Sequence, residues 1–342
     1  MTSSSATILK IAEEVGVSHM TVSRVLRGPN NFRRSDAAAR AKQILAAARR
    51  LGYRPHAAAR IMRAGRFGSI ALLISSQPHR SALPDTLVGG ITQVLNQHDL
   101  NLSLVRMSDE ELTDSRFMPR ILTEYMADGL LIDYFDRIPA RMMQIIDQYN
   151  IPHIWINHRR EHSCVYPDDL DAGRRATQGL LSMGHQRIAF AHFTSSTHYS
   201  VADRYEGYEA AMRQAGLQPI RLSEPGGILI ADRVVYAEHH LKHDRPTAIV
   251  GYDDVEVNPI LFAACRLGLQ VPRDLSLVAF HNQPFSMAGL NIQTLIVPEQ
   301  AVGRFAVEML LQRISGTPKS LQPARSVPFD FVPGDSVCRL SN

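Results

Sequence analysis

Apolar residues near the N-terminus recur with the period of a helix. Ile8, Ile11, Ala12 and Val15 are spaced i, i+3, i+4 and i+7, which places them on one face of a short helix. Gly16 comes directly afterwards and is expected to end the helix. The pattern therefore predicts a short amphipathic helix that needs a partner for its apolar face.

A second short helix is predicted directly after this glycine. Ser18 is a favoured N-cap residue, and Gly28-Pro29 ends the helix. Val22, Val25 and Leu26 would face the first helix. Two short helices joined by a tight turn that contains glycine predict a helix-turn-helix, whose second helix enters the major groove of DNA.

The opposite face of this second helix supplies the candidate DNA contacts. His19 and Met20 at its start, and Arg24 one turn later, point away from the apolar face. We expect His19 and Met20 to contact bases, because the first residues of such a helix reach the base edges. For Arg24 a base or phosphate contact is favoured over a simple surface charge. Thr21 and Ser23 carry short hydroxyls that suit phosphate contacts.

A third helix and a basic linker complete the N-terminal region. The third helix is predicted from a Ser35 cap to a Gly52 stop. In the linker, Pro55 suits the first turn of a helix and Gly65 ends it. The stretch between them is rich in alanine and about ten residues long, below the ~12–15 residues that an isolated helix needs in water. We expect it to become helical only when a partner holds it.

Beyond Ser69, short aliphatic runs alternate with helical patterns. The candidate strands are Ile70–Ser75, Leu102–Arg106, Gly129–Asp133, His153–Ile156, Arg187–His192, Ala248–Gly251 and Ser276–Phe280. Helices such as Leu87–Gln97, Arg204–Ala215 and Val302–Ile314 separate them. Continuous aliphatic strands and repeated β-α units predict doubly wound parallel sheets. Roughly 270 residues exceed one such domain, so two similar lobes are expected.

Charge is divided unevenly between these two regions. Residues 1–66 hold 13 Lys or Arg and 3 Asp or Glu, a net charge of +10, whereas the remainder holds 24 basic and 30 acidic residues, a net charge of −6. A compact basic segment is typical of a protein that binds a polyanion, because each neutralised phosphate releases condensed counterions. Charge alone leaves a solvated basic surface open, and the adjoining helix-turn-helix favours DNA.

The cysteines and the overall hydropathy indicate in which cellular compartment the protein is found. Cys164, Cys265 and Cys338 are far apart and odd in number, which fits a reduced compartment and argues against a disulfide scaffold or a structural zinc site. No stretch approaches the ~20 apolar residues of a membrane span, and the polar N-terminus has no apolar signal core. We therefore expect no membrane partner and a location in the cytoplasm.

The N-terminal motif resembles the opening of the LacI/GalR family of bacterial transcriptional regulators. The resemblance is carried by Ala12, Gly16-Val17-Ser18 and the run Thr21–Leu26. It implies that His19 and Met20 occupy the most variable base-reading positions. It also implies DNA contacts from further residues of this region, namely Thr7, Ser18, Arg27, Asn31 and Arg33.

The linker resembles the hinge helix of this family. The resemblance implies that one hinge helix from each subunit of a dimer lies in the minor groove, with contacts from Pro55, Ala59 and Arg60. A lever side chain, usually Leu in the family and here Met62, would wedge into the central base step, and apolar wedges of this type include Met. Alternatively, Met62 packs on the body.

Motifs of the larger region continue the resemblance, among them Ala127–Ile132, Gly184–Phe190, Arg204–Tyr208, Arg245–Ile249 and Gly268–Ser276. They imply a two-lobed α/β domain like a periplasmic binding protein, with a small effector between the lobes at the carboxyl ends of the strands. The resulting domain prediction is a DNA-binding domain at 1–53, a hinge helix and linker at 54–67, and an effector-binding and dimerisation domain at 68–342.

Carried over by position, Arg204 is the foremost candidate for an effector contact, with a salt bridge to Glu206 or to another lobe residue as the alternative. Asp253 or Asp254 would bind a sugar hydroxyl, or cap the helix that follows. Tyr134 and Trp155 are candidates for stacking on the ligand, although a Trp in an apolar strand is more often part of the core.

His281 departs from the family pattern, because many sugar-sensing relatives carry Asp at this position. A histidine there favours an acidic ligand, such as a sugar acid or a phosphorylated sugar, or acts only as a hydrogen-bonding residue. The sequence leaves both open.

Taken together, these features predict a sequence-specific transcriptional regulator that binds a palindromic operator as a homodimer. A carbohydrate-derived effector would control its DNA binding. The resemblance implies a repressor, because that is the usual role in the family. A solute-binding protein would share the body but has no use for a helix-turn-helix. An enzyme is not indicated, because GxSxG, GxxxxGK[ST], GxGxxG and HExxH are all missing from the sequence. We expect no catalytic residue, no cofactor and no metal ion.

Overall fold

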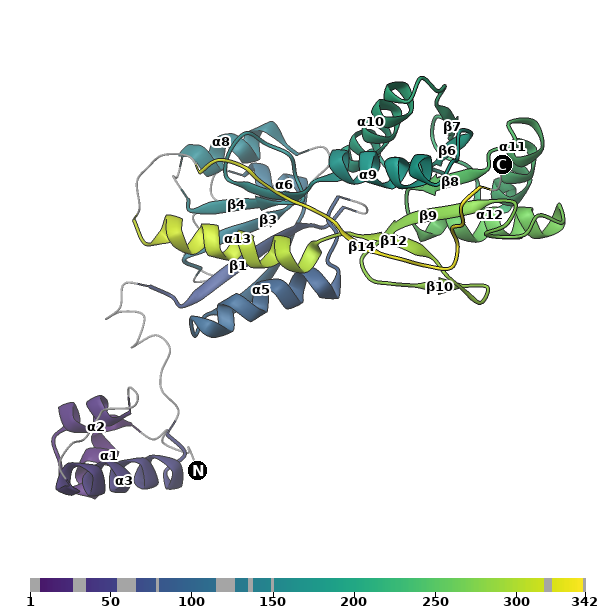
Figure 1. Ribbon diagram of the computed structural model, residues 1–342. Coiled ribbons are helices and arrows are strands. Elements are labelled where there is room, and N and C mark those ends of the chain that lie inside the picture. The colour runs from purple at the N-terminus through teal and green to yellow at the C-terminus, as the bar shows by residue number, and fades with distance from the viewer. Residues whose placement is uncertain are drawn as a thin grey trace. The chain divides into compact units, whose positions relative to one another are not determined.

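The computed structural model describes residues 7–26, 35–53, 66–77, 80–114, 127–134, 138–148, 151–316 and 322–340 (Figure 1). The chain divides into two compact units: Met1–Phe67, here called the head, and Gly68–Asn342, here called the body. Seven of the proposed DNA contacts lie outside the described residues: Arg27, Asn31, Arg33, Pro55, Ala59, Arg60 and Met62.

The head consists of α1 (Ile8–Val15), α2 (His19–Val25) and α3 (Ser35–Arg50). Its core is formed by the apolar faces that the sequence pattern predicts, with Ile11, Val22 and Ile44 fully buried. The other buried members of this core are Ala12, Val25, Ala41, Ala47 and Ala48. Because most of them are alanines, the three helices approach one another closely around a small core.

The body begins with a lobe built on one six-stranded sheet, here called lobe 1. Its strands, in the order β13-β5-β4-β3-β1-β2, are β1 (Ser69–Ser75), β2 (Asn101–Met107), β3 (Gly129–Asp133), β4 (His153–Ile156), β5 (Cys164–Pro167) and β13 (Arg325–Val327). All are paired in parallel. Its helices are α5 (Asp85–Gln97), α6 (Asp109–Thr113), α8 (Ala140–Gln148) and α13 (Glu299–Ile314).

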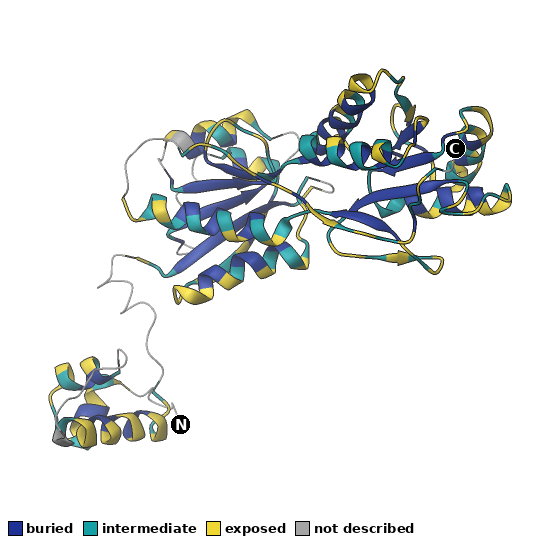
Figure 2. Ribbon diagram, in the orientation of Figure 1, coloured by how far each residue is buried: buried dark blue, intermediate teal, exposed yellow. Residues whose placement is uncertain are grey.

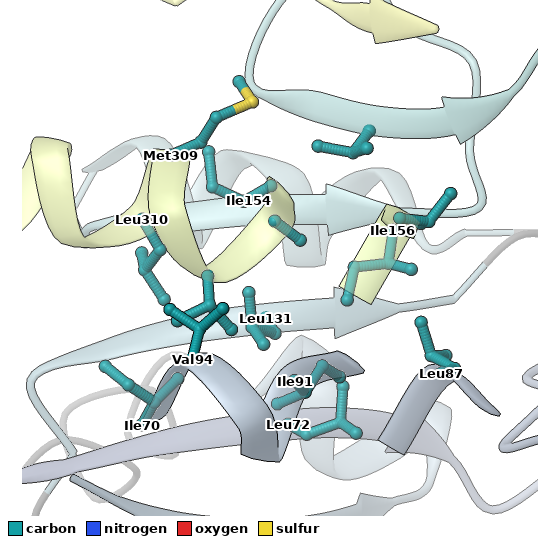
Figure 3. Close-up of a cluster of buried hydrophobic side chains, with 14 of the residues drawn as sticks. Ile70, Leu72, Leu87, Ile91, Val94, Leu131, Ile154, Ile156, Met309 and Leu310 are labelled. Atoms are coloured by element: carbon teal, nitrogen blue, oxygen red, sulfur yellow. The ribbon is translucent and has the colours of Figure 1, made fainter. Parts of the chain in front are cut away.

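Helices cover both faces of this sheet, which explains why its strands are aliphatic throughout. On one face, α5 and α13 pack over Ile70, Leu72, Leu131 and Ile154 (Figure 3). On the other face, α6 and α8 pack with the alternate strand residues, such as Leu73. A strand buried on both sides has no polar face, so it appears in the sequence as an uninterrupted apolar run.

The second lobe, here called lobe 2, repeats this architecture. Its sheet has the order β14-β12-β9-β8-β6-β7, with β6 (Ile188–Ala191), β7 (Ile220–Leu222), β8 (Ala248–Gly251), β9 (Ser276–His281), β12 (Gln293–Ile296) and β14 (Asp330–Val332). It is flanked by α9 (Asp169–Ser182), α10 (Tyr199–Gln214), η1 (Ile230–Asp232), α11 (Arg233–His243) and α12 (Asp254–Arg266), with a small hairpin of β10 (Ser286–Met287) and β11 (Leu290–Asn291). Only the β12–β14 pair of this sheet is antiparallel within the described residues.

The predicted fold class is confirmed. Every strand that the sequence predicts is present, with ends that differ by at most one residue, and the central strands of both sheets are buried (Figure 2). The predicted helices begin two to five residues earlier than the apolar pattern suggests, because their first turns are polar and are formed by cap residues. No helix among the described residues is long and apolar enough to cross a membrane.

Candidate functional site

The turn of the head between α1 and α2 fixes how α2 is presented. Gly16 has a φ of 68°, in the left-handed region that glycine adopts without strain, and closes α1. Ser18 caps α2, with its Oγ accepting a hydrogen bond of 3.2 Å from the Thr21 backbone N–H. The Ser18 and Thr21 hydroxyls are also 2.9 Å apart. These contacts hold the first turn of α2 in place.

The exposed face of α2 carries the residues proposed to contact DNA. Val22 and Val25 are buried against the rest of the head, whereas His19, Met20 and Arg24 are exposed. Met20 has 68% of its surface exposed, so its side chain is accessible for a contact outside the head. The candidate phosphate contacts are less accessible, since Thr21 and Ser23 are half-buried. Thr7 caps α1 through the backbone N–H of Lys10.

The described basic residues of the head give its surface a positive charge. All of them are exposed: Lys10, Arg24, Arg40, Lys42, Arg49, Arg50 and Arg66. Arg50 pairs with Glu14 of α1, which leaves the balance strongly positive. Exposed guanidinium and ammonium groups beside a capped, exposed helix suit a double-stranded polyanion.

In the body, a cavity of about 810 Å³ lies between the two lobes. Lobe 1 lines it with the loop that follows β1 and with Asn157 after β4, and lobe 2 lines it with the ends of β6, β8 and β9 and with α10. The cavity therefore lies at the carboxyl ends of parallel strands, where α/β folds bind small ligands. Of the six candidate effector contacts, Arg204, Asp253, Asp254 and His281 line it.

Arg204 is held rigidly in the cavity wall. Its Nε donates to Asp169 Oδ1 and its Nη1 donates to the Tyr252 carbonyl oxygen, both at 2.8 Å. The guanidinium also lies 4.4 Å from the Phe280 ring centroid and 4.6 Å from that of Tyr252. The salt bridge is thus to Asp169 and not to Glu206, and Nη2 is the nitrogen that remains for a ligand.

The Arg204–Asp169 pair is almost completely buried, with 6% and 1% of the residue surfaces exposed. Burial raises the pKa of Asp169 above its ordinary value, and Arg204 offsets part of that rise. Burial alone would lower the pKa of Arg204, but the Asp169 carboxylate and the Tyr252 ring raise it above its ordinary value. Arg204 therefore keeps its positive charge at the cavity wall.

Asp253 performs the capping role that the sequence left open, and it also lines the cavity. Its Oδ1 accepts from the Asp254 backbone N–H at 2.7 Å, while Glu256 Oε2 accepts from the Asp253 N–H at 2.9 Å. The Asp253 side chain also accepts from the Glu256 backbone N–H, so Asp253 and Glu256 bond each other reciprocally in a capping box. Burial and the neighbouring Asp254 carboxyl raise the pKa of Asp253 to about 6, and burial raises that of Glu256 to about 7.

His281 ends β9 and is half-buried at the cavity. Its Nδ1 lies 2.8 Å from the Gln283 carbonyl oxygen, and its ring lies 4.8 Å from that of Phe285. The Gln283 backbone N–H also lies 3.3 Å from Nδ1, so Gln283 can satisfy Nδ1 in either neutral tautomer. With Nδ1 occupied by Gln283, Nε2 is the ring nitrogen that remains for a ligand.

The suggestion that Trp155 or Tyr134 stacks on a ligand is wrong. Trp155 is 1% exposed and belongs to the core of lobe 1, because β4 is covered on both faces. Tyr134 is fully buried and does not line the cavity. Its hydroxyl donates to Asp109 and accepts from Arg80 Nη1 at 3.0 Å. Tyr134 therefore positions Arg80, which does line the cavity.

Several cavity residues were not found from the sequence. Asp169 and Glu299 begin α9 and α13, and Asn157, His198 and Tyr252 follow strand ends. The sequence contains the adjacent pair Asp168-Asp169, but it does not indicate which of the two carboxylates faces the cavity. Asp168 caps α9 through the Asp171 N–H, and Asp169 bonds Arg204. Only the approach of α9 to α10 joins residues 169 and 204.

Contacts between the lobes close one side of the cavity. Arg159, in the segment between β4 and β5, donates from Nη1 to Asp203 Oδ2 of α10 at 2.7 Å. His198 Nε2 lies 3.3 Å from the Asn157 carbonyl oxygen. These polar contacts join lobe 1 to lobe 2 directly beside the ligand space, so a change in lobe closure would break or reform them.

Comparison with known proteins agrees with both parts of the chain. Residues 7–56 match the model of "Bacterial regulatory proteins, lacI family", and residues 177–337 match "Periplasmic binding protein-like domain". The chain is 30% identical over 336 residues to the HTH-type transcriptional regulator RafR of Escherichia coli, covering 96% of this chain and 97% of RafR.

Two solved structures share the fold. The Lac repressor dimer bound to operator and the anti-inducer ONPF superposes with a TM-score of 0.76 at 20% identity, covering 98% of this chain and 100% of that one. The transcriptional regulator CelR in complex with cellobiose superposes with a TM-score of 0.61 at 21% identity, covering 97% and 99%.

Proposed function

The chain belongs to the LacI family of bacterial regulatory proteins, and from this premise we propose how its own residues perform DNA recognition and ligand control. It is a helix-turn-helix transcriptional regulator, and the relatives are regulators rather than enzymes. The observation that carries the proposal is that one chain joins an exposed, capped α2 to a polar cavity between two lobes.

In the proposed mechanism, α2 of the head lies in the major groove. His19 and Met20 contact base edges, Arg24 contacts a base or a phosphate, and the hydroxyls of Thr21 and Ser23 contact the backbone. The capping contact from Ser18 orients α2 for this task. Two heads in a homodimer would read the two halves of a palindromic operator, and the linker with Met62 would contact its centre.

Lobe 2 offers a surface for a homodimer. Leu229 and Ile230 are 75% and 81% exposed, and Val235 of α11 is 60% exposed. Leu229 and Ile230 are consecutive at the start of η1, and Val235 follows in the first turn of α11. Apolar residues exposed in this number favour burial against a second copy of the chain.

We place the regulator in the cytoplasm, where its DNA is accessible.

The effector would bind in the cavity between the lobes. Arg204 Nη2 supplies a fixed donor, and the Asp253, Asp254 and Glu299 carboxylates supply acceptors. Alternating donors and acceptors in one cavity suit a polyhydroxyl compound, since each hydroxyl both donates and accepts. A carbohydrate-derived effector fits this chemistry, and CelR holds cellobiose in a related fold.

Control of DNA binding follows from differential affinity. If the effector binds one degree of lobe closure more tightly than another, it shifts the population toward that state. The Arg159–Asp203 contact between the lobes is the part of the body that would sense this change. Coupling of this kind changes operator affinity by about 5–150-fold.

The test is a screen of sugars, sugar acids and sugar phosphates with the full chain. A true effector is expected to raise the melting temperature of the body and to change operator affinity within that range. Asp254→Ala should weaken ligand binding about tenfold or more, whereas the exposed control Asp330→Ala should not. The proposal fails if ligands that stabilise the body leave operator affinity unchanged.

A further inference from the structure

We propose that Asp253, Asp254 and His281 together bind one divalent metal ion, of the Mn²⁺ or Zn²⁺ type, at the wall of the interlobe cavity. No metal ion is expected from the sequence, and Asp253 and Asp254 lie 28 and 27 positions before His281, so the three residues form no short ligand motif. The role of the ion in effector recognition rests on the proposed function, but binding of the ion itself does not.

The first support is the geometry of the donor atoms. One donor atom from each of the three residues lies within 4.8 Å of the other two. They come from two separate elements, the start of α12 and the end of β9. An ion held at about 2.1 Å from each atom needs donor separations of about 3 Å in a tetrahedral or octahedral arrangement. Rotation of these half-buried side chains can supply the remaining approach.

The second support is the way in which His281 is held. A histidine that ligates a metal through one ring nitrogen usually donates its other ring N–H to a carboxylate or a backbone carbonyl. His281 Nδ1 has such a partner in the Gln283 carbonyl oxygen, at 2.8 Å. This contact lies outside the three-residue cluster, and an ion on Nε2 would select the tautomer in which Nδ1–H donates to the Gln283 carbonyl oxygen.

The third support is the charge balance of the cavity wall. The two lining arginines are already paired, Arg204 with Asp169 and Arg80 with Asp109. Within the described residues, Asp253, Asp254 and Glu299 form no ion pair, although all three line the same space. Arg204 and the N-terminus of α12 lie near Asp253 and offset only part of this charge. The cavity therefore attracts a cation and repels an anionic ligand.

A bound ion would change what this cavity can recognise. Three protein ligands leave coordination positions open toward the cavity, and vicinal hydroxyls or a carboxylate of the effector would fill them. The imidazole among the three ligands favours a transition metal such as Zn²⁺ over Ca²⁺ or Mg²⁺.

A surface pair of histidines is the main competing site. His239 and His243 of α11 are exposed, are one helical turn apart, and have ring centroids 4.1 Å from each other. Two imidazoles at this spacing also bind transition metals, so an unmodified titration with Zn²⁺ would count both sites. Mn²⁺ is the better probe, because it favours carboxylate oxygens over a site made of imidazole alone.

The experiment titrates MnCl₂ into the full chain, without DNA or effector, and follows the loss of the free-Mn²⁺ EPR signal. One bound Mn²⁺ per chain is expected, and Asp254→Asn and His281→Gln should each weaken binding at least about tenfold. Asp254 is a suitable variant because no part of the capping box depends on its side chain. His239→Gln and the exposed Asp330→Asn are the matched controls and should leave binding unchanged.

Two outcomes would overturn the proposal. Either no Mn²⁺ or Zn²⁺ binds in the micromolar range, or binding survives in both Asp254→Asn and His281→Gln. A circular-dichroism melt of each variant excludes loss of folding as the reason for lost binding. Operator binding is measured separately on the same samples. If DNA binds and metal does not, this inference fails alone; if metal binds and DNA does not, the proposed function fails instead.

Discussion

The head and the body hold their charged side chains in opposite ways. In the described part of the head, every Lys and Arg is exposed and the core is made of small and aliphatic residues. In the body, Asp133, Asp169, Arg204 and Glu256 are buried at 0%, 1%, 6% and 0% exposure. Exposed charges have no cost of desolvation and are free to meet an external polyanion. Buried ionisable side chains need hydrogen-bonding partners or a shifted pKa, and two of these four, Asp169 and Arg204, line the cavity.

This difference predicts whether a substitution in each unit affects mainly DNA binding or mainly folding. Removing an exposed side chain from the head should change binding and leave folding nearly intact. Removing a buried charge from the body should disturb folding first, because its partner remains behind without compensation. Substitutions chosen in matched pairs can therefore break or sharpen the contrast between the two units.

The largest effect is expected at Arg204. Arg204→Ala leaves the buried Asp169 carboxylate unpaired, and should lower the free energy of unfolding of the body by about 3–5 kcal/mol. Adding Asp169→Asn should recover part of the loss. Arg213→Ala in the same helix removes an exposed pair with Glu209 and should cost at most about 1 kcal/mol. Urea denaturation measures all three, and equal losses for Arg204→Ala and Arg213→Ala would contradict the account.

Next in size is the contact between α5 and α13. A Cβ at Gly90 would lie 2.0 Å from the Gln300 carbonyl oxygen, whereas a Cβ at the adjacent Gly89 would meet nothing within 4 Å. Gly90→Ala should therefore destabilise the body by about 3 kcal/mol. Gly89→Ala should stabilise it by up to about 1 kcal/mol through helix propensity. Thermal melts of the two variants compare the effects directly, and two similar shifts would show that the helices are not in close contact.

A pH-dependent effect is expected at Asp133. Burial, with a smaller effect from Glu299, raises its pKa well above the ordinary value, although the Ala82 N–H that bonds it lowers the pKa in part. A carboxyl with a raised folded-state pKa stabilises the protein at low pH and loses this contribution as pH rises through that pKa. Asp133→Asn should thus be more stable than the parent at pH 8.

The advantage of Asp133→Asn should shrink as pH falls and disappear only below about pH 3, where the carboxyl is protonated in the folded and unfolded states alike. Urea midpoints from about pH 3 to pH 8 measure this difference. Asp330→Asn, at an exposed position of β14, is the control and should show a flat difference. A constant gap for Asp133→Asn would mean that its carboxyl titrates like an exposed one.

The smallest effect separates the two units by their helix caps. Ser18→Ala removes the cap of α2 and should destabilise the head by about 1 kcal/mol. Ser108→Ala removes the cap of α6 and should destabilise the body by a similar amount. Hydrogen exchange resolved by peptide assigns each change to its unit. Faster exchange in both units for either variant would show that the head and the body unfold together.

Much of the fold could be predicted from the sequence, because strands that are buried on both faces, such as Ile70–Ser75, have continuous aliphatic sequences that can be recognised. The strands that could not be predicted are short or polar. β7 has three residues, and β13 has two exposed residues among its three. They exist because a neighbouring strand offers hydrogen bonds, as β5 does for β13, and not because of their own pattern.

The candidate site could be predicted only for residues whose role depends on residues close to them in the sequence. The cap at Ser18 and the exposed positions of α2 follow from local spacing, so the sequence indicated them. Asp169, Arg204 and Glu299 meet because α9, α10 and α13 converge on one cavity. Their spacing along the chain does not predict that they lie close together. Arg204 was identified as a candidate effector contact only through the family resemblance.

The central claim is that the first residues of α2 read the bases of a specific operator, and selection from a pool of random DNA duplexes tests it most directly. The parent chain and Met20→Ala are selected in parallel at near-physiological salt, since affinity without a stated salt concentration is uninterpretable. Met20 is 68% exposed, so its removal should leave the head folded. The account predicts a palindromic consensus for the parent, and for Met20→Ala a changed base preference at one symmetric position in each half-site. The same consensus from both proteins, or no consensus from the parent, would contradict it.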